Sequence, residues 1–212
     1  MPVETTLYSE QVQRWPNTGR HILAQYDDES IIVYQAYCPD IGRFAIKTGG
    51  FGGGFSYSRM SWVKPNFLWM MYRSGWGTKP NQEVTLGLRI RRTFFDALLA
   101  AAVASSWDRE RFASEEEWAL AVARSSVRLQ WDPDHHPTGA KLDRRAIQLG
   151  LRGDLLDAFG NRELIEVLDL SAFVADQRSA LESVGIAALK VPQESVYRPL
   201  DPSLAKQLGL AE

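Results

Sequence analysis

The sequence RMSWVKPNFLWMMYRSGWGTK occupies residues 59–79, and the rest of the chain is organised around it. This stretch contains three of the four methionines and three of the seven tryptophans, so it is the densest apolar and aromatic segment of the protein. Trp62, Trp69 and Trp76 recur every seven residues and would share one face wherever the segment is helical. Such a face is expected either to be buried or to bind a ligand.

Cations interrupt this apolar stretch at Lys64, Arg73 and Lys79. A helix that serves only as core rarely needs cations at such close intervals. Pro65 suits a first helical turn, and Gly75 can end the helix by adopting positive φ. We therefore predict a short helix over about 65–73 beside a cationic, aromatic-lined site, with a central core helix as the alternative.

Composition indicates an ordinary globular protein, since 45% of the 212 residues are hydrophobic and 24% are charged. We expect one α+β domain with mixed, mostly antiparallel sheets flanked by helices. No apolar run is long enough to cross a membrane and no signal peptide is recognisable, so a cytoplasmic location without membrane association is expected. The single cysteine, Cys38, excludes an internal disulfide.

Positive charge is concentrated in one part of the chain. Between Arg43 and Arg92 there are nine Lys and Arg but one acid, Glu83, so this segment carries +8 while the whole chain carries −2. Cations interleaved with aromatic rings suit a nucleotide, a dinucleotide or a nucleic acid strand. Alternatively, these cations form ion pairs with acids elsewhere in the fold.

Hydrophobic periodicity predicts alternating short elements. We expect strands at 20–26, 30–37, 55–62, 83–92, 127–131 and 163–170. We expect helices at 39–48, 65–73, 93–106, 115–125, 154–159 and 172–183, with a last one near Pro202. Ser114 opens a capping box with Glu117, and Ser171 is expected to cap the helix that follows it.

Two polar features remain open between a structural and a functional interpretation. Gln35 falls on the otherwise apolar face of the strand at 30–37, where it is either a satisfied core amide or a ligand-binding group. The loop at 49–54 has five glycines in six residues and is either a flexible flap or a phosphate cradle, with Gly52 and Gly53 as candidate contacts. It lacks the lysine of a P-loop.

The segment at 132–137 reads DPDHHP and contains two of the three histidines. Its carboxylates and imidazoles could bind a metal ion. No further histidine or cysteine cluster supports such a site, and acidic segments bracketed by prolines are typical of turns. We therefore expect a loop here and no metal.

Several longer motifs resemble the DUF4291 family of bacterial proteins. They are YQAY at 34–37, SRMSWVKPNFLWMMYRSGW at 58–76, LRIRR at 88–92, QWDPDH at 130–135 and RRAIQLGLRG at 144–153. The resemblance covers a core over about 20–178. The mixed polar sequence at 1–19 indicates an N-terminal arm, and the proline-containing sequence at 190–212 indicates a C-terminal tail that wraps the core. The resemblance implies a fold rather than an activity.

The order of elements is also similar to that of ADP-ribosyltransferase domains. This resemblance implies NAD as a cofactor, with Gln35 in the first-strand position that grips it and Glu166 as the late-strand catalytic acid. Tyr57 or Tyr72 would stack on the nicotinamide. Cleavage of the bond from ribose to nicotinamide needs a positioned carboxylate and clamps for the pyrophosphate. Arg59, Lys64 and Arg73 are the candidate clamps, and the acceptor would be a nucleic acid or a protein.

A competing interpretation is a non-catalytic module that binds DNA or RNA through a basic sheet face and aromatic stacking. Its candidate contacts are Arg89, Arg91, Trp76 and Lys79. A scaffold without a small ligand is the third class. Hydrolysis by a serine triad and P-loop chemistry are disfavoured because their motifs are missing.

Overall fold

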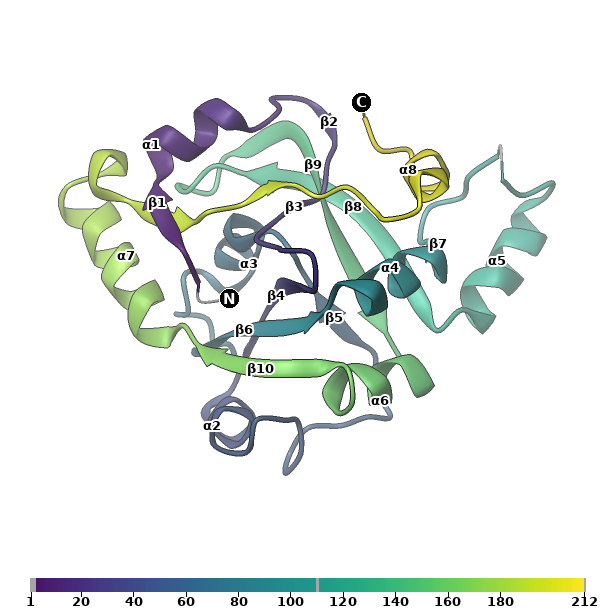
Figure 1. The fold of residues 1–212 in the computed structure, drawn as a ribbon, viewed down its shortest axis with the longest axis horizontal. Helices are drawn as coiled ribbons and strands as arrows, with labels where there is room; N and C mark the ends of the chain where they lie inside the picture. Colours follow the sequence, from purple (N-terminus) through teal and green to yellow (C-terminus); the bar gives the residue numbers. More distant parts are fainter. Residues whose placement is uncertain (1–2, 110, 212) are drawn as a thin grey trace.

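The two strands with the clearest alternation, β4 (Ser30–Tyr37) and β6 (Val84–Arg91), pair antiparallel in the computed structural model (Figure 1). β10 (Leu164–Asp169) pairs antiparallel with the other edge of β6, so the strand order of this sheet is β10-β6-β4. The structure describes residues 3–109 and 111–211. The predictions of a single α+β domain and of these strands are confirmed.

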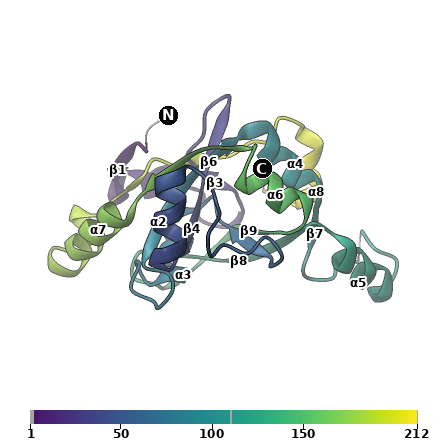
Figure 2. The same ribbon diagram turned by 90° about the horizontal axis from the view of Figure 1, so that it is seen from below.

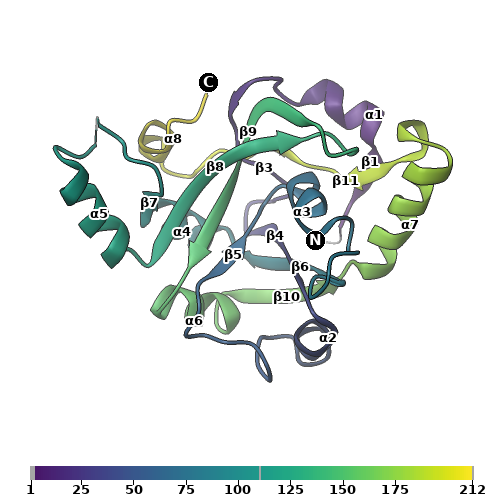
Figure 3. The same ribbon diagram turned by 180° about the vertical axis from the view of Figure 1, so that it is seen from behind.

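A second sheet is built on the long hairpin of β8 (Val127–His135) and β9 (Lys141–Leu151), which curls across the molecule in Figure 3. β7 (Ala102–Ala104) pairs parallel with β8, and β2 (Gly19–Arg20) pairs parallel with β9. β5 (Ser61–Val63) pairs antiparallel with the end of β9. The second sheet is therefore mixed.

The two sheets meet at Lys64. The Tyr34 N–H of β4 donates to the Lys64 carbonyl at 2.6 Å, and the Lys64 N–H donates to the Tyr34 carbonyl at 3.3 Å. Two residues earlier, Trp62 of β5 lies opposite Gly150 of β9. The segment that carries Lys64 is thus hydrogen-bonded to both sheets, which fixes its backbone at their junction.

Eight α-helices occur among the described residues. They are α1 (Tyr8–Gln11), α2 (Pro39–Thr48), α3 (Phe67–Ser74), α4 (Arg92–Ala100), α5 (Glu115–Arg124), α6 (Asp154–Gly160), α7 (Ser171–Ser183) and α8 (Pro202–Leu208). Helix α3 packs against β4 and β8, while α2 packs against β4, β6 and β10. Figure 2 shows α5 and α7 at opposite ends of the domain, with α2 and α3 between them.

Side chains of β4 alternate between two apolar clusters. Ile31 and Val33 belong to the cluster that contains Leu86 of β6, whereas Ile32 and Tyr34 belong to the cluster that contains Phe67 of α3. Both faces of β4 are buried, as its nearly continuous apolar sequence requires. Trp69 is 7% exposed, as expected for a buried tryptophan at the centre of the aromatic stretch.

Local capping signals set several helix boundaries. α2 begins at Pro39 and ends before Gly49, whose φ of 72° is easily accessible to glycine. The Ser114 hydroxyl accepts from the Glu117 N–H at 3.1 Å, and the Glu117 carboxylate accepts from the Ala113 N–H at 3.1 Å. The predicted bounds of α2 and the predicted capping box are confirmed.

The chain ends fold back onto this core. β1 (Thr5–Leu7) pairs with β11 (Lys190–Pro192), and β3 (Leu23–Ala24) pairs with β12 (Ser195–Val196). Short 3-10 turns occupy Val12–Arg14 and Ile186–Ala188. All four paired strands are two or three residues long, so tertiary pairing rather than local propensity holds them.

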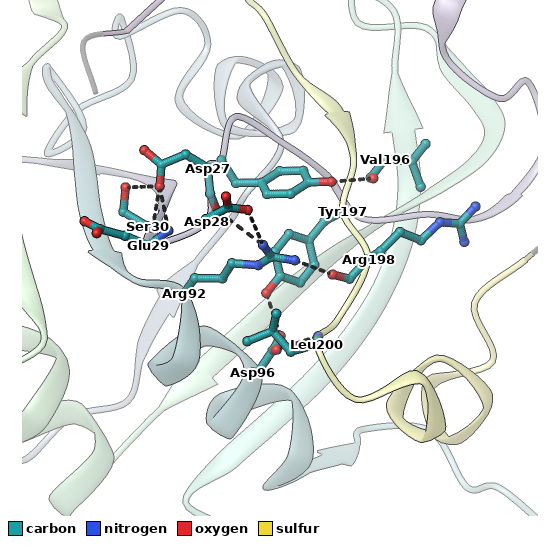
Figure 4. Close-up of polar contacts among 11 residues, drawn as sticks. Asp27, Asp28, Glu29, Ser30, Arg92, Asp96, Val196, Tyr197, Arg198 and Leu200 are labelled. Carbon is teal, nitrogen blue, oxygen red and sulfur yellow. Dashed lines mark hydrogen bonds and ion pairs between the residues drawn. The ribbon is translucent and has the colours of Figure 1, made fainter.

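Polar contacts of α4 hold the C-terminal segment (Figure 4). The Tyr197 hydroxyl donates to Asp96 at 2.6 Å, and the Leu200 N–H donates to the other oxygen of the same carboxylate at 2.8 Å. Arg92 donates to the Arg198 carbonyl at 3.0 Å and forms an ion pair with Asp28 at 3.6 Å. This network joins α4, the 27–30 turn and the chain after β12.

Some predicted elements are wrong. The tryptophan repeat does not lie on one helix, because Trp62 is in β5, Trp69 is in α3 and Trp76 follows the helix with a φ of 55°. The short helix predicted over about 65–73 is present as α3, but it begins at Phe67, so Pro65 lies before its first turn. Asn66 is the N-cap, and its side chain accepts from the Trp69 N–H at 2.7 Å. A seven-residue spacing alone does not keep a chain helical across glycines that end the helix.

Tertiary pairing also changes predicted elements elsewhere. The expected helix over 93–106 ends at Ala100, because the next residues form β7 and pair with β8. The expected strand over 55–62 is reduced to β5, and the single strand expected over 20–26 is split between β2 and β3. Ser171 is the first residue of α7 and its preceding cap is Leu170.

The predicted loop over 132–137 is largely strand, because β8 continues to His135 with a register shift after Pro133. β7 pairs with β8 only at Val127–Leu129, so the edge of Pro133 that faces away from β9 has no strand partner within the described chain. A proline on such an edge loses no ladder hydrogen bond. Long pairing with β9 therefore outweighs the local turn signals.

Within the described chain, no helix combines the length and the apolar character needed to cross a membrane.

Candidate ligand site

A cavity of about 700 Å³ lies where the two sheets meet. Its walls come from β4, β5, α3, β8, β9 and the two segments that follow α2 and α3. Its main polar lining residues are Gln35, Ser61, Arg59, Lys64, Arg73, Gln130 and Gln148. Its apolar lining includes Phe55, Met60, Trp62 and Met70. The cavity therefore combines three cations, several amides and flat apolar surfaces.

Lys64 is the buried cation of this cavity, with 4% of its surface exposed. Its ammonium forms no hydrogen bond or ion pair with any described residue, and its one recorded side-chain contact is a cation–π contact with Trp69 at 5.3 Å. The pKa of Lys64 is lowered to about 8, chiefly by burial and also by the nearby charge of Arg73, while Asp132 opposes this shift. An anionic ligand in the cavity would reverse this unfavourable environment.

Arg59 and Arg73 line the same cavity from exposed positions. The Arg73 guanidinium donates to the Gln82 amide oxygen at 3.2 Å, and the Arg59 guanidinium has no hydrogen-bond or ion-pair partner among the described residues. Neither side chain is held by a carboxylate there. Both remain able to bind a phosphate group.

Gln35 is 3% exposed and is anchored by its amide nitrogen. Its Nε2 donates to Ser61 Oγ at 2.8 Å and to the Trp62 carbonyl at 3.0 Å. Ser61 Oγ also contacts the Tyr37 hydroxyl at 2.9 Å. The Gln35 Oε1 atom, by contrast, is buried without a hydrogen-bond partner in the described structure. Gln35 is therefore only half satisfied as a core amide.

The opposite wall comes from the polar face of the β8–β9 hairpin. Gln130 lies directly across from Gln148, and both side chains donate to the Asp132 carboxylate, at 3.1 Å and 2.7 Å. Gln148 also donates to Gln130 Oε1 at 3.3 Å. Burial raises the pKa of Asp132, while Gln148 and the charge of Lys64 oppose the rise. These three residues form a connected hydrogen-bonded group beside Lys64.

Aromatic residues support Lys64 from the side of α3. The Lys64 ammonium lies over the ring of Trp69. The Trp69 ring packs edge to face with His135, with 5.9 Å between the ring centroids. His135 also stacks on Tyr72 at 3.5 Å with an interplanar angle of 10°. Tyr72 thus stacks on a histidine of β8 and is not among the cavity-lining residues. Burial lowers the pKa of His135.

The glycine loop contributes less than its composition suggests. Gly52 and Gly53 pack against the ring of Phe44, where an added Cβ would lie 2.7 Å and 3.1 Å from ring atoms, and neither glycine lines the cavity. Gly54 does line it. The Tyr57 hydroxyl donates to the Phe51 carbonyl at 3.1 Å, so this side chain also lies outside the lining.

Glu166 lies on β10, away from the residues that line the cavity. It forms an ion pair with Arg89 of β6, and Arg91 of the same strand forms one with Glu163 at 3.6 Å. Gln35 and Glu166 are therefore not brought together in one cavity. The acids of β10 and the preceding turn balance the two arginines of β6.

The candidate nucleic-acid contacts are divided between two places. Trp76 donates from its indole to the Pro137 carbonyl at 3.2 Å, and Lys79 donates to the Arg73 carbonyl at 2.9 Å. Gly77, next to Trp76, lies beside Thr85 near the start of β6. Arg91 is six residues further along, about 20 Å at the rise of a strand. These residues do not form one compact surface.

The sequence patterns did not identify Gln130 and Gln148 as candidate site residues, and they placed Asp132 in a loop instead of a strand. Alternation along 127–132 does place Gln130 and Asp132 on one face, which was a usable signal. The pairing of Gln130 with Gln148, which are 18 residues apart, depends on the hairpin register. Among the described residues, no group of three or more His, Cys, Asp or Glu is placed to hold a metal ion.

The fold and the cavity define a class of α+β protein with a cationic, amide-rich cavity at the junction of two sheets. The model of the domain of unknown function DUF4291 matches residues 21–197, so the chain belongs to this family. The match extends further towards the C-terminus than the predicted core of 20–178. Curated proteins gave no match to the chain.

Proposed function

We propose that the protein binds a phosphate-bearing nucleotide in the cavity at the sheet junction. The observation that carries this proposal is Lys64, a cation with 4% exposure that forms no ion pair or side-chain hydrogen bond among the described residues and feels only the more distant charge of Asp132. Burying an unpaired charge is costly, and proteins normally pair or neutralise such groups. A bound phosphate would supply the missing partner, with Arg59 and Arg73 at the same cavity adding charge.

The size and lining of the cavity favour a ligand larger than phosphate. A volume of about 700 Å³ falls within the range typical of small-molecule and cofactor sites. Trp62 and Phe55 offer flat surfaces to a heteroaromatic ring, and Gln35 offers a polar contact. A ring joined to a phosphate satisfies both parts of the site, and NAD is the first ligand that we would test.

Isothermal titration tests this proposal with NAD, ADP and pyrophosphate, using adenosine as the ligand without phosphate. We expect NAD or ADP to bind more tightly than adenosine. Lys64→Met should weaken nucleotide binding by about 2 kcal/mol, or roughly 30-fold in Kd, because one charged contact is lost. Lys206→Met, at an exposed position of α8, is the matched control. Unchanged affinity in Lys64→Met would reject the proposal.

Transfer of ADP-ribose from NAD is a reaction that such a site could support if a carboxylate stabilises the developing positive charge. Neither acid lines the cavity itself, but Asp132 hydrogen-bonds to two lining glutamines, whereas Glu166 is paired with Arg89. If the protein cleaves NAD, Asp132→Asn should lower turnover by roughly 10² or more. Glu166→Gln should leave it within about twofold, and the opposite result would restore Glu166 as the acid.

A further inference from the structure

We infer that the cavity selects nucleotides whose heteroaromatic ring carries an NH2 group. This inference rests on the proposed nucleotide binding and concerns the part of the ligand that the cations do not contact. The argument comes from counting the donors and acceptors of two amide side chains, Gln35 and Gln148, that line the cavity from different sheets.

The hydrogen bonds of Gln35 fix which end of its amide is free. The Trp62 carbonyl can only accept, so the atom 3.0 Å from it is the amide nitrogen. The second N–H of that nitrogen donates to Ser61 Oγ at 2.8 Å. Both donors are used. The remaining Oε1 atom is an acceptor without a partner among the described residues, and because it is buried, a ligand reaches it only after the Gln35 side chain shifts.

Gln148 is fixed in the same manner by a different set of partners. Its Nε2 donates to Asp132 Oδ2 at 2.7 Å and to Gln130 Oε1 at 3.3 Å, and these use both of its N–H groups. Asp132 also accepts from Gln130, which holds the carboxylate in place. The Gln148 Oε1 atom accepts no hydrogen bond from any described residue. A second amide oxygen is thus left as an acceptor.

The fixed Gln148 acceptor, joined by Gln35 Oε1 where the Gln35 side chain shifts towards the cavity, favours a ligand that donates hydrogen bonds and disfavours one that presents a carbonyl at the same position. A carbonyl would face an amide oxygen, and neither group could be satisfied. Sites built to hydrogen-bond a substrate N–H reject analogues that lack it far more strongly than apolar pockets reject a size change. The amide arrangement therefore acts as a specificity element, separate from the cations that bind phosphate.

The NH2 group has two possible sources in a nucleotide. One is the exocyclic amine of adenine, and the other is the carboxamide of nicotinamide. Their shared chemistry is an NH2 group that is bonded to a heteroaromatic ring of a phosphate ester either directly or through a carbonyl carbon. ADP compared with inosine diphosphate tests the amine, and NAD compared with nicotinic acid adenine dinucleotide tests the carboxamide.

Titration calorimetry with these four ligands gives two affinity ratios for the wild-type protein. We expect at least one ratio to favour the NH2-bearing member by about 10-fold or more. Gln148→Met removes one acceptor and should bring that ratio towards one, while melting curves confirm that the variant is folded. Gln13→Met, at an exposed position of the N-terminal segment, should leave the ratio unchanged.

The outcomes distinguish a failure of the NH2 preference from a failure of the proposed nucleotide binding. Nucleotides that bind with both ratios close to one would overturn the NH2 preference and leave nucleotide binding standing. A ratio that stays at its wild-type value in Gln148→Met would also overturn the assignment. If none of the four ligands binds at millimolar concentration, the proposed function fails and the preference fails with it.

Discussion

Two cations from the same basic part of the chain, Arg92 and Lys64, occupy opposite environments. Arg92 donates to two backbone carbonyls, pairs with Asp28 and lies over the rings of Tyr26 and Tyr197 at 5.2 Å and 5.4 Å (Figure 4). Burial alone would lower the pKa of Arg92, but the hydrogen bond with Tyr197 and the nearby charges outweigh burial and raise it. The Lys64 side chain has no comparable hydrogen bonds, and burial lowers its pKa.

The difference shows that local charge excess does not by itself define a binding surface. Part of the positive charge between 43 and 92 is used internally, because Arg89, Arg91 and Arg92 all pair with acids. Lys64 instead lines a cavity and forms no ion pair among the described residues, with Asp132 acting on it only from a longer distance. An unpaired buried cation is a more specific sign of a ligand site than the sum of charges around it.

The largest expected effect concerns the polar network that joins Arg92, Asp96 and Tyr197. Asp96→Ala should lower the free energy of unfolding by about 3–4 kcal/mol, because the Tyr197 hydroxyl and the Leu200 N–H each lose a charged acceptor. Urea denaturation measures this loss, and nucleotide affinity should stay within about twofold. Asp176→Ala, at an exposed position of α7, is the matched control. Equal stabilities of the two variants would contradict a structural role for this network.

The next effect concerns Lys64 and pH. Its pKa in the folded protein is about 8, below the ordinary 10.5, so the unfolded state binds more protons between these values. Stability therefore rises with pH through this window as the native-state penalty disappears. Lys64→Met should be more stable than the wild type at pH 7 by about 2–3 kcal/mol, with the gap closing by about pH 10.5.

Urea midpoints of wild type and Lys64→Met at pH 7, 8, 9 and 10 test this difference. Because the other groups titrate equally in both proteins, the difference in stability between the two proteins at each pH reports the titration of Lys64 alone. A constant gap would show that the Lys64 pKa is not lowered. Nucleotide affinity of the wild type should also decrease above about pH 8, since the neutral amine no longer attracts phosphate.

A smaller effect is expected from Gly150→Ala, which tests whether the packing of the cavity wall matters. An added Cβ would lie 2.7 Å from Met60 Sδ and 2.9 Å from a ring atom of Trp62, and both side chains line the cavity. We expect a loss of about 1–2 kcal/mol in stability and a 3- to 10-fold weaker nucleotide affinity. Gly50→Ala, whose Cβ would have an ordinary 3.5 Å contact, is the control. Equal affinities would place the ligand away from this wall.

The smallest effect should come from Arg91→Ala. This side chain is 59% exposed and its ion pair with Glu163 spans 3.6 Å, so we expect a stability change below about 0.5 kcal/mol. Nucleotide affinity should not change. Binding of a single-stranded oligonucleotide, measured by fluorescence anisotropy, tests the alternative surface. A marked loss of such binding in Arg91→Ala would favour the nucleic-acid interpretation over the cavity.

Elements with strong local signals could be predicted closely. Pro39 and Gly49 bracket α2, Ser114 caps α5, and the alternation in β4 and β6 identifies both central strands. Elements that depend on distant partners were misjudged. β7 would be a continuation of α4 if it did not pair with β8, and the DPDH segment would be a loop without β9.

The candidate site divides in a similar manner. The sequence singled out Arg59, Lys64 and Arg73, and the fold brings these three cations to one cavity. Gln35 was left open between core and ligand-binding roles, and only the hydrogen bonds show that its nitrogen is satisfied while its oxygen is not. Gln148 emerged only through its pairing across the hairpin.

The sequence by itself determined the α+β class, the central strands and the basic aromatic segment, because backbone conformation, side-chain alternation and charge are properties of neighbouring residues. Only the tertiary structure decided which cations are paired. Arg92 meets the carbonyl of Arg198, 106 residues away, and Arg89 meets Glu166 across β6 and β10. Lys64 is left unpaired because the junction of two sheets buries it, and a charge pair depends on distances in space that no local pattern of residues encodes.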